Sequence, residues 1–187
     1  MPKIVGGPQP FLPERAEARG AVRARSPLGR VGPEPAEGLL LYVHVPFCRS
    51  KCRYCAFHSQ AYDPVALAWY LKTLGLEAVF WSERLGRPKV RTVYFGGGTP
   101  SLLTPSQLAA VLDTLRRRFD IDPGAEITVE ANPDSALDVS WFRALISLGV
   151  NRLSLGVQSL ADQWLAALGR PHSAAQAVES YFLARKA

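Results

Sequence analysis

Three cysteines that lie close together give this chain its clearest chemical potential. Cys48, Cys52 and Cys55 follow a C-x3-C-x2-C spacing, and the sequence contains no other cysteine. Thiolates are soft ligands that suit iron–sulfur clusters. Because a [4Fe–4S] cube has four irons, three cysteines would leave one iron open to another ligand. The loop therefore predicts a cluster whose open iron can take part in chemistry.

The same three thiols allow other chemistry. A disulfide is disfavoured because one cysteine would stay unpaired, the loop is tight, and we expect no secretory signal. Buried free cysteines would seldom cluster so closely by chance. A structural zinc ion is the main alternative, since His58 extends the pattern to C-x3-C-x2-C-x2-H, a plausible Cys3His ligand set. Spacing alone leaves both the cluster and zinc open.

Alternating strands and helices are predicted from residue 39 onward. Strands are expected at 39–45, 90–95, 126–130 and 152–156, and helices at 64–85, 105–119, 141–148 and 173–187. The last helix has Val178 and Phe182 as its inward-facing residues. Repeated strand–helix units predict parallel strands with right-handed crossovers, in a barrel or a doubly wound sheet.

Residues with chemical potential fall where these strands end. The cysteine loop, Gly96 to Gly98, Glu130 and Gln158 lie at or just past carboxyl ends, where ligands gather in parallel α/β folds. Glycines let backbone approach a ligand, although a tight turn would explain them equally well. His44 shares a strand face with Tyr42 and could as well be a core histidine. His58 and His172 are expected to be structural or surface residues.

Four sequence blocks carry a family resemblance. They are YVHVPFCRSKCRYC at 42–55, VYFGGGTPSLL at 93–103, ITVEANPDS at 127–135 and NRLSLGVQSL at 151–160. The first resembles the cluster loop of radical S-adenosylmethionine (SAM) enzymes, and together they resemble the oxygen-independent coproporphyrinogen III oxidase family. The resemblance implies a (β/α)6 partial barrel, of which about four βα units fit here. Residues 39–187 are therefore expected to be the N-terminal part of a longer core domain.

The resemblance also implies roles for individual residues. It makes Cys48, Cys52 and Cys55 the cluster ligands, and it assigns cofactor contacts to Tyr42, Tyr54, Gly97, Gly98, Thr99, Glu130, Gln158 and Arg170. Gly97 would contact the SAM on the cluster, and Gly98 and Thr99 would face a second SAM. The Glu130 carboxylate would suit ribose hydroxyls, although strand-end glutamates are commonly just solvated.

The remaining contacts divide between the two SAM positions. Gln158 and Arg170 would line the second SAM position. The alternative for Arg170 is an ordinary exposed arginine at the end of a helix. Tyr42 and Tyr54 would pack beside SAM and the cluster.

Phe57 separates two branches of the family. The oxidase typically extends its motif to C-x3-C-x2-C-x-C, and this chain has Phe57 where the fourth cysteine would stand. The departure resembles the heme chaperone branch, whose members bind heme and transfer it to apoproteins, with a heme-binding motif expected beyond Ala187. The implied ligands are a [4Fe–4S] cluster, SAM and heme. An oxidase that decarboxylates coproporphyrinogen III, and a zinc-stapled α/β module, remain as alternatives.

Composition and charge argue against nucleic acid and a membrane as partners. There are 22 Lys plus Arg against 16 Asp plus Glu, a net charge of +6, but no basic stripe interleaved with aromatics, so nucleic acid is not expected. No apolar run reaches membrane-span length. Reduced cysteines point to the cytoplasm. Residues 1–38 are rich in Pro, Gly, Ala and Arg, and we expect a disordered extension there.

Overall fold

A four-stranded parallel sheet forms the centre of the fold. The computed structural model describes residues 38–136 and 138–187, so the extension expected to be disordered, residues 1–38, lies outside the described range except for Gly38. The strands are β1 (Leu39–Val45), β4 (Lys89–Gly97), β5 (Asp120–Ala131) and β6 (Arg152–Leu155), paired in that order. Every neighbouring pair is parallel, which confirms the predicted strand–helix alternation.

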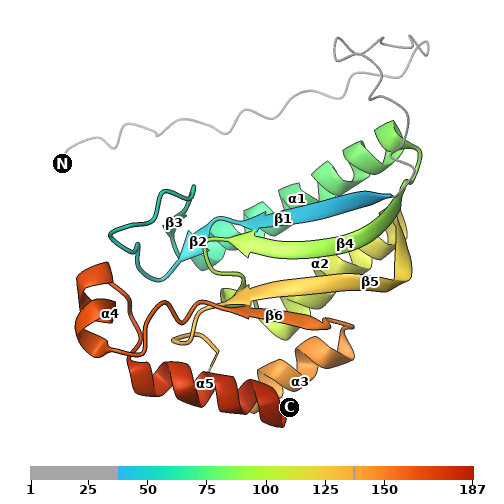
Figure 1. Cartoon of the computed structure of the whole chain (residues 1–187). Coiled ribbons are helices and arrows are strands. Elements are labelled where there is room, and N and C mark those ends of the chain that lie inside the picture. The colour runs from blue at the N-terminus through green and yellow to red at the C-terminus, as the bar shows by residue number, and fades with distance from the viewer. Residues whose placement is uncertain (1–37, 137) are drawn as a thin grey trace, which may run out of the picture. The chain divides into compact units, whose positions relative to one another are not determined.

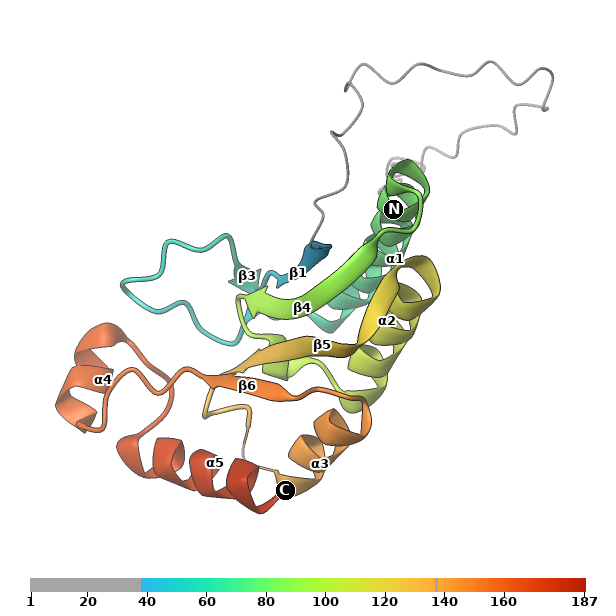
Figure 2. The ribbon, with the colours of Figure 1, turned by 45° about the vertical axis from the view of Figure 1, so that its right-hand side comes forward.

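The helices follow the strands, and all of them except α4 lie along one face of the sheet (Figures 1 and 2). They are α1 (Pro64–Leu85), α2 (Pro105–Arg118), α3 (Val139–Ser147), α4 (Asp162–Leu168) and α5 (Ala174–Lys186), with a short 3-10 turn η1 (Pro100–Leu102). Figures 1 and 2 show α1 and α2 side by side along β1, β4 and β5, with α3 and α5 below β6. This is an α/β arrangement of the partial-barrel type.

Local sequence signals set where the long helices begin. The Asp63 carboxylate accepts the backbone N–H groups of Val65 and Ala66 at 2.8 and 3.3 Å, which caps α1. Thr104 and Gln107 form a reciprocal capping box at the start of α2, as Ser173 and Gln176 do for α5. These caps satisfy backbone donors that a helix start leaves free.

Several features of the fold differ from the sequence-based expectation, among them helix α4, which was not expected. Strand β5 begins at Asp120 rather than 126, because its first residues pair with Lys89 and Val90 before a bulge. A short strand pair, β2 (Phe47–Cys48) with β3 (Gln60–Ala61), closes the cysteine loop. The expected inward residues of α5, Val178 and Phe182, are exposed, and Ala177 and Ser180 are buried instead.

The two faces of the sheet have opposite character. Val43, Val93, Phe95 and Val129 point toward the helices and are buried. Side chains two residues apart in a strand share a face, so the residues between them line the other face. That face carries polar residues, and at its carboxyl-terminal edge it holds the candidate site. Within the described residues, none of the helices has the length and apolar character needed to cross a bilayer.

Candidate functional site

A cavity of about 320 Å³ lies at the carboxyl ends of the strands. Every residue of the expected cluster and SAM site lines it, except Tyr42. Segments from the cysteine loop, the end of β4, the end of β5 and the turn after α4 meet there. The fold therefore brings together residues that are up to 122 positions apart, as the parallel topology predicted.

The three cysteines lie on a loop that is fastened at several points. All three thiols are free and partly exposed. The Thr99 hydroxyl donates to Cys48 Sγ at 3.6 Å, and Arg170 Nη1 donates to Cys52 Sγ at 3.2 Å. Thiol groups from one loop that face a common cavity fit an iron–sulfur cluster in donor chemistry.

Two arginines between the cysteines attach the loop to the rest of the fold. Arg49 donates to the Asp134 carbonyl at 2.9 Å and lies 3.6 Å from its carboxylate. The Arg53 backbone N–H donates to the Leu168 carbonyl at the end of α4, at 3.0 Å. Gly169 follows in the left-handed region, with Arg53 packed against it. These arginines thus position the cysteine loop, although the C-x3-C-x2-C motif leaves the residue type at both positions open.

The zinc alternative receives little geometric support. His58 is exposed and does not line the cavity. In the described part of the chain, no three Cys, His, Asp or Glu side chains gather closely enough to hold one metal ion. A Cys3His site needs all four ligands around a single ion.

The glycines at 96–98 are surrounded by the chain's own atoms. A Cβ on Gly97, whose φ is +107°, would lie 2.6 Å from His44 Nδ1. A Cβ on Gly98 would lie 2.7 Å from the Phe47 carbonyl oxygen, and one on Gly96 would lie 2.8 Å from the Tyr94 ring. Since real Cβ atoms essentially never come this close, a side chain at any of the three positions would force its neighbours to move, and at Gly98 these neighbours are backbone atoms. Contact with SAM would be a second use of the same turn.

Glu130 is held in one orientation by two donors. The Tyr94 hydroxyl donates to Oε1 at 2.6 Å, and the Gly97 backbone N–H donates to Oε2 at 3.2 Å. The hydrogen bond to Glu130 is the largest cause that raises the pKa of Tyr94, followed by burial. Each carboxylate oxygen has more than one lone pair, so Glu130 can still accept hydrogen bonds from a ligand. The strand-end glutamate is therefore fixed rather than simply solvated.

Tyr94 is a site residue that the sequence reasoning missed. It lies opposite Tyr42 in the β1–β4 register, and the two rings stack with centroids 6.0 Å apart. Tyr42 is 56% exposed and lies beside the cavity rather than in its lining. The signal was available, because a two-residue alternation from Gly96 places Tyr94 on the same face.

Gln158 has an unusual backbone conformation, and Arg170 is more buried than an arginine at an exposed helix end would be. Gln158 is exposed to the cavity with φ of 61°, a left-handed backbone that non-glycine residues seldom adopt. Arg170 is half-buried and donates to Asn132 Oδ1 and to the Gly156 carbonyl, the latter at 2.9 Å. Its Nε is buried and has no hydrogen-bond partner in the described part of the chain. An exposed helix-end arginine is therefore the wrong description of Arg170.

His172 is buried and structural. One ring nitrogen, Nε2, lies 3.1 Å from the Val157 carbonyl and donates to it, next to Gln158. Burial is the largest cause that lowers the pKa of His172. The residue supports the backbone turn that presents Gln158 to the cavity.

Comparison with known proteins identifies the family. The model of the radical SAM superfamily matches residues 42–187, and the chain belongs to this superfamily. The family implies a [4Fe–4S] cluster and SAM. In 152 aligned residues the chain is 41% identical to "Heme chaperone HemW" of Mycobacterium tuberculosis, covering 79% of this chain and 38% of that protein.

Two further relatives belong to the oxidase branch. An "Oxygen-independent coproporphyrinogen III oxidase" of Bradyrhizobium diazoefficiens is 44% identical over 121 residues, covering 64% of this chain and 27% of that one. The structure of coproporphyrinogen III oxidase (HemN) from Escherichia coli aligns with a TM-score of 0.71 and 30% identity, over 79% of this chain and 34% of that one. The chain thus spans less than half the length of these relatives.

Proposed function

We propose that this protein is a heme chaperone on a radical SAM scaffold, which binds heme and transfers it to apoproteins. It is 41% identical, over 79% of its length, to a protein named as a heme chaperone. The observation that carries the choice of branch is Phe57. Its ring lines the cavity beside the cysteines and is 62% exposed, at the place where the oxidase motif has a further cysteine. A phenyl ring offers neither a metal ligand nor a reactive thiol.

The cofactors of the proposal are the cluster and SAM. Cys48, Cys52 and Cys55 would hold a [4Fe–4S] cluster, and its open iron would receive SAM. When bound and reduced, the cluster supplies one-electron cleavage of the SAM sulfonium bond. The chain's own part is to orient SAM and to exclude water, as proteins do for reactive cofactors.

The SAM contacts of the proposal are those that the family resemblance implies, and all of these residues except Tyr42 line the cavity. Gly97 and Glu130 would bind the SAM on the cluster, with Tyr42 and Tyr54 packed beside it. Gly98, Thr99, Gln158 and Arg170 would line a second SAM position. The guanidinium of Arg170 is suited to an anionic group of a ligand, because one of its buried nitrogens has no partner among the residues that the structure describes.

The second candidate is an oxygen-independent coproporphyrinogen III oxidase. The observations that favour it are the 44% identity to a relative of that name and the TM-score of 0.71 to the HemN structure. It shares the cluster and SAM residues with the first candidate. The two candidates differ in the ligand that binds in addition to the cluster and SAM. It is heme for the chaperone and a porphyrinogen substrate for the oxidase.

Two measurements on the full-length protein separate the candidates. Spectroscopic titration should show saturable heme binding, and strictly anaerobic incubation with coproporphyrinogen III, SAM and a reductant should yield no protoporphyrinogen IX. The Cys48→Ala variant supplies the background for SAM-dependent conversion. Sustained product formation above that background would replace the chaperone assignment by the oxidase.

The cellular setting of the proposal is the cytoplasm. All three thiols are free, as cluster assembly requires, and a reducing compartment keeps them so. The recipients would be heme-accepting apoproteins, and neither nucleic acid nor a membrane is part of the proposal.

A further inference from the structure

His44 connects four separate parts of the fold. Its ring nitrogen Nε2 lies 2.8 Å from the His58 carbonyl, in the segment that returns from the cysteine loop. Its Nδ1 lies 3.2 Å from the Tyr42 hydroxyl. Its backbone carbonyl accepts the hydroxyl of Tyr70 from α1. Its ring packs against Gly97 so closely that no Cβ would fit there.

The two ring contacts of His44 define its tautomer. A backbone carbonyl can only accept a hydrogen bond, so Nε2 carries the proton and donates to His58. The neutral ring then has an unprotonated Nδ1, which accepts the hydroxyl hydrogen of Tyr42. His44 therefore uses one nitrogen to hold the loop and the other to orient a tyrosine at the cavity edge.

The loop contact fixes the far side of the cluster motif. His58 lies three residues beyond Cys55, and the neighbouring Gln60 N–H donates to the Pro46 carbonyl at 2.8 Å. The segment from Cys48 to Cys55 is thus closed on both sides, by the β2–β3 pair and by the His44 ring. The hydrogen bond uses only the backbone of His58, whose ring also lies near the His44 ring, with centroids 6.3 Å apart.

We propose that His44 is a positioning residue of the cluster and SAM site. Its Nε2 arm keeps the cysteine loop in the geometry that accepts the cluster, and its Nδ1 arm fixes the hydroxyl of Tyr42 beside the cavity. The proposal rests on the proposed function only for the presence of a cluster on the three cysteines. Outer-shell contacts of this kind affect metal affinity by about 10- to 100-fold.

Three substitutions separate the two arms. The His44→Phe variant keeps a ring over Gly97 and removes both hydrogen bonds. His44→Gln places an amide donor near the Nε2 position and restores the contact with the His58 carbonyl. His44→Asn places an amide oxygen near the Nδ1 position and restores the acceptor for Tyr42. The matched control is His58→Ala, which removes a side chain but leaves the carbonyl in place.

The readouts are measured on the full-length protein under anaerobic conditions. Iron and sulfide content report cluster occupancy, and the change in the electron paramagnetic resonance signal of the reduced cluster on adding SAM reports SAM positioning. Hydrogen exchange of residues 56–62 in the cluster-free protein reports loop closure independently of any cofactor. Circular dichroism confirms that each variant is folded.

The expected pattern distinguishes His44 from a general core residue. His44→Phe should lose cluster affinity by about tenfold and should exchange faster at residues 56–62. His44→Gln should recover both, but not the SAM-induced signal, which His44→Asn should recover instead. His58→Ala should behave as wild type. Wild-type exchange and cluster content in folded His44→Phe would overturn the proposal, as would an equal loss in His58→Ala.

The same measurements distinguish a failure of the proposed function from a failure of the proposal for His44. A wild-type protein that takes up no iron and sulfide would refute the cluster assignment. Faster exchange of residues 56–62 in cluster-free His44→Phe would still support the loop-closing role, and unchanged exchange would refute it.

Discussion

At the scale of single residues, the glycine turn at 96–98 packs closely against neighbouring parts of the protein even without a ligand. The His44 ring occupies the position that a Gly97 side chain would take, and the Gly97 backbone N–H donates a hydrogen bond to Glu130. A bulky side chain at Gly97 would therefore displace His44 as well as obstruct SAM. Loss of SAM binding in a Gly97→Val variant would have two causes, so a substitution that separates them is needed.

We expect Gly97→Ala to destabilise the fold through both the clash with His44 and the positive φ. The strained backbone alone costs about 1–3 kcal/mol. In a His44→Ala background the clash disappears, so the two substitutions should show a coupling of about 0.5–3 kcal/mol in urea unfolding. Strict additivity would mean that the His44 ring moves aside without cost, which would contradict the packing described above.

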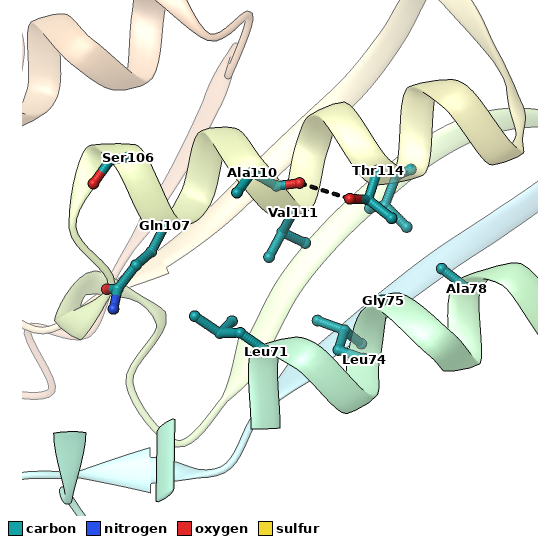
Figure 3. A pocket seen from close by; sticks show the side chains of 10 residues that line it. Leu71, Leu74, Gly75, Ala78, Ser106, Gln107, Ala110, Val111 and Thr114 are labelled. Carbon is teal, nitrogen blue, oxygen red and sulfur yellow. Dashed lines mark hydrogen bonds between the residues drawn. The ribbon is translucent and has the colours of Figure 1, made fainter. Parts of the chain in front are cut away.

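Gly75 is the opposite case, a glycine that the packing of the described residues does not require. It lies in the middle of α1, and a Cβ there would meet nothing within 4 Å. It borders a cavity of about 280 Å³ between α1 and α2, lined largely by small and apolar side chains (Figure 3). Glycine inside a helix is less favourable than alanine because of its backbone freedom.

We expect Gly75→Ala to stabilise the protein by about 0.5–1 kcal/mol. The free energy of unfolding in urea measures it, with Gly96→Ala as the matched control. That control should destabilise, since its Cβ would lie 2.8 Å from the Tyr94 ring. A destabilised Gly75→Ala variant would indicate that something outside the described residues fills the groove in the folded protein.

At the scale of elements, Tyr70 links α1 to the strand that precedes the cysteine loop. Its hydroxyl donates to the His44 carbonyl, and its ring meets Phe47 edge-on at 5.7 Å. Burial, with the nearby charge of Glu77 as a smaller cause, raises the pKa of Tyr70 to about 12. The folded state therefore favours the neutral phenol, and the hydrogen bond needs it.

This pKa predicts a loss of stability at high pH. The contribution of Tyr70 is complete below its unfolded pKa of about 10 and is lost as the pH rises to about 12. Because the side chain is only half-buried, we expect about 1–2 kcal/mol rather than the full shift. Urea unfolding of wild type and Tyr70→Phe between pH 9 and 11.5 should show the stability difference shrinking. A constant difference would contradict the raised pKa.

The sequence predicted elements better than it predicted which side chains face one another. Strand and helix positions came from apolar periodicity, and the carboxyl-end location of the site came from parallel topology. The exposed Val178 and Phe182 show the limit, because α5 has apolar residues on more than one face and periodicity cannot choose between them. Helix α4 was missed because its seven residues are too few for a periodic signal.

The site was predictable in outline and not in its contacts. The motif spacing indicated the cysteines, and the strand ends indicated Glu130 and Gln158. Nothing local to Arg170 indicates that its guanidinium lies against Cys52, because that contact joins residues 118 positions apart. Likewise, the pairing of Tyr94 with Glu130 depends on the register between β4 and β5. Long-range register and loop docking are set by the whole fold rather than by neighbouring residues.

At the scale of the whole molecule, the cysteine loop joins regions that are far apart in the chain. It contacts the segment after β5 through Arg49 and Asp134, and the end of α4 through Arg53 and Leu168. The next residues, Gly169 and Arg170, pack on the same loop. Helix α4 has only seven residues, too few for stability on its own, so these contacts help to hold it.

Cluster binding should therefore stabilise α4 as well as the loop. Metal binding orders the segment that carries the ligands, and docked neighbours share that gain. We expect amide hydrogen exchange across α4 to slow by about tenfold when the full-length protein is loaded anaerobically with iron and sulfide. Helix α2, which packs against α1 and contributes no residue to the cavity lining, supplies the internal reference and should change little. Arg170→Ala removes the contacts with Cys52 and Gly156, so it should weaken the protection of α4 while leaving that of the loop. Protection confined to the cysteine loop in the wild-type protein would show that α4 is not coupled to the cluster.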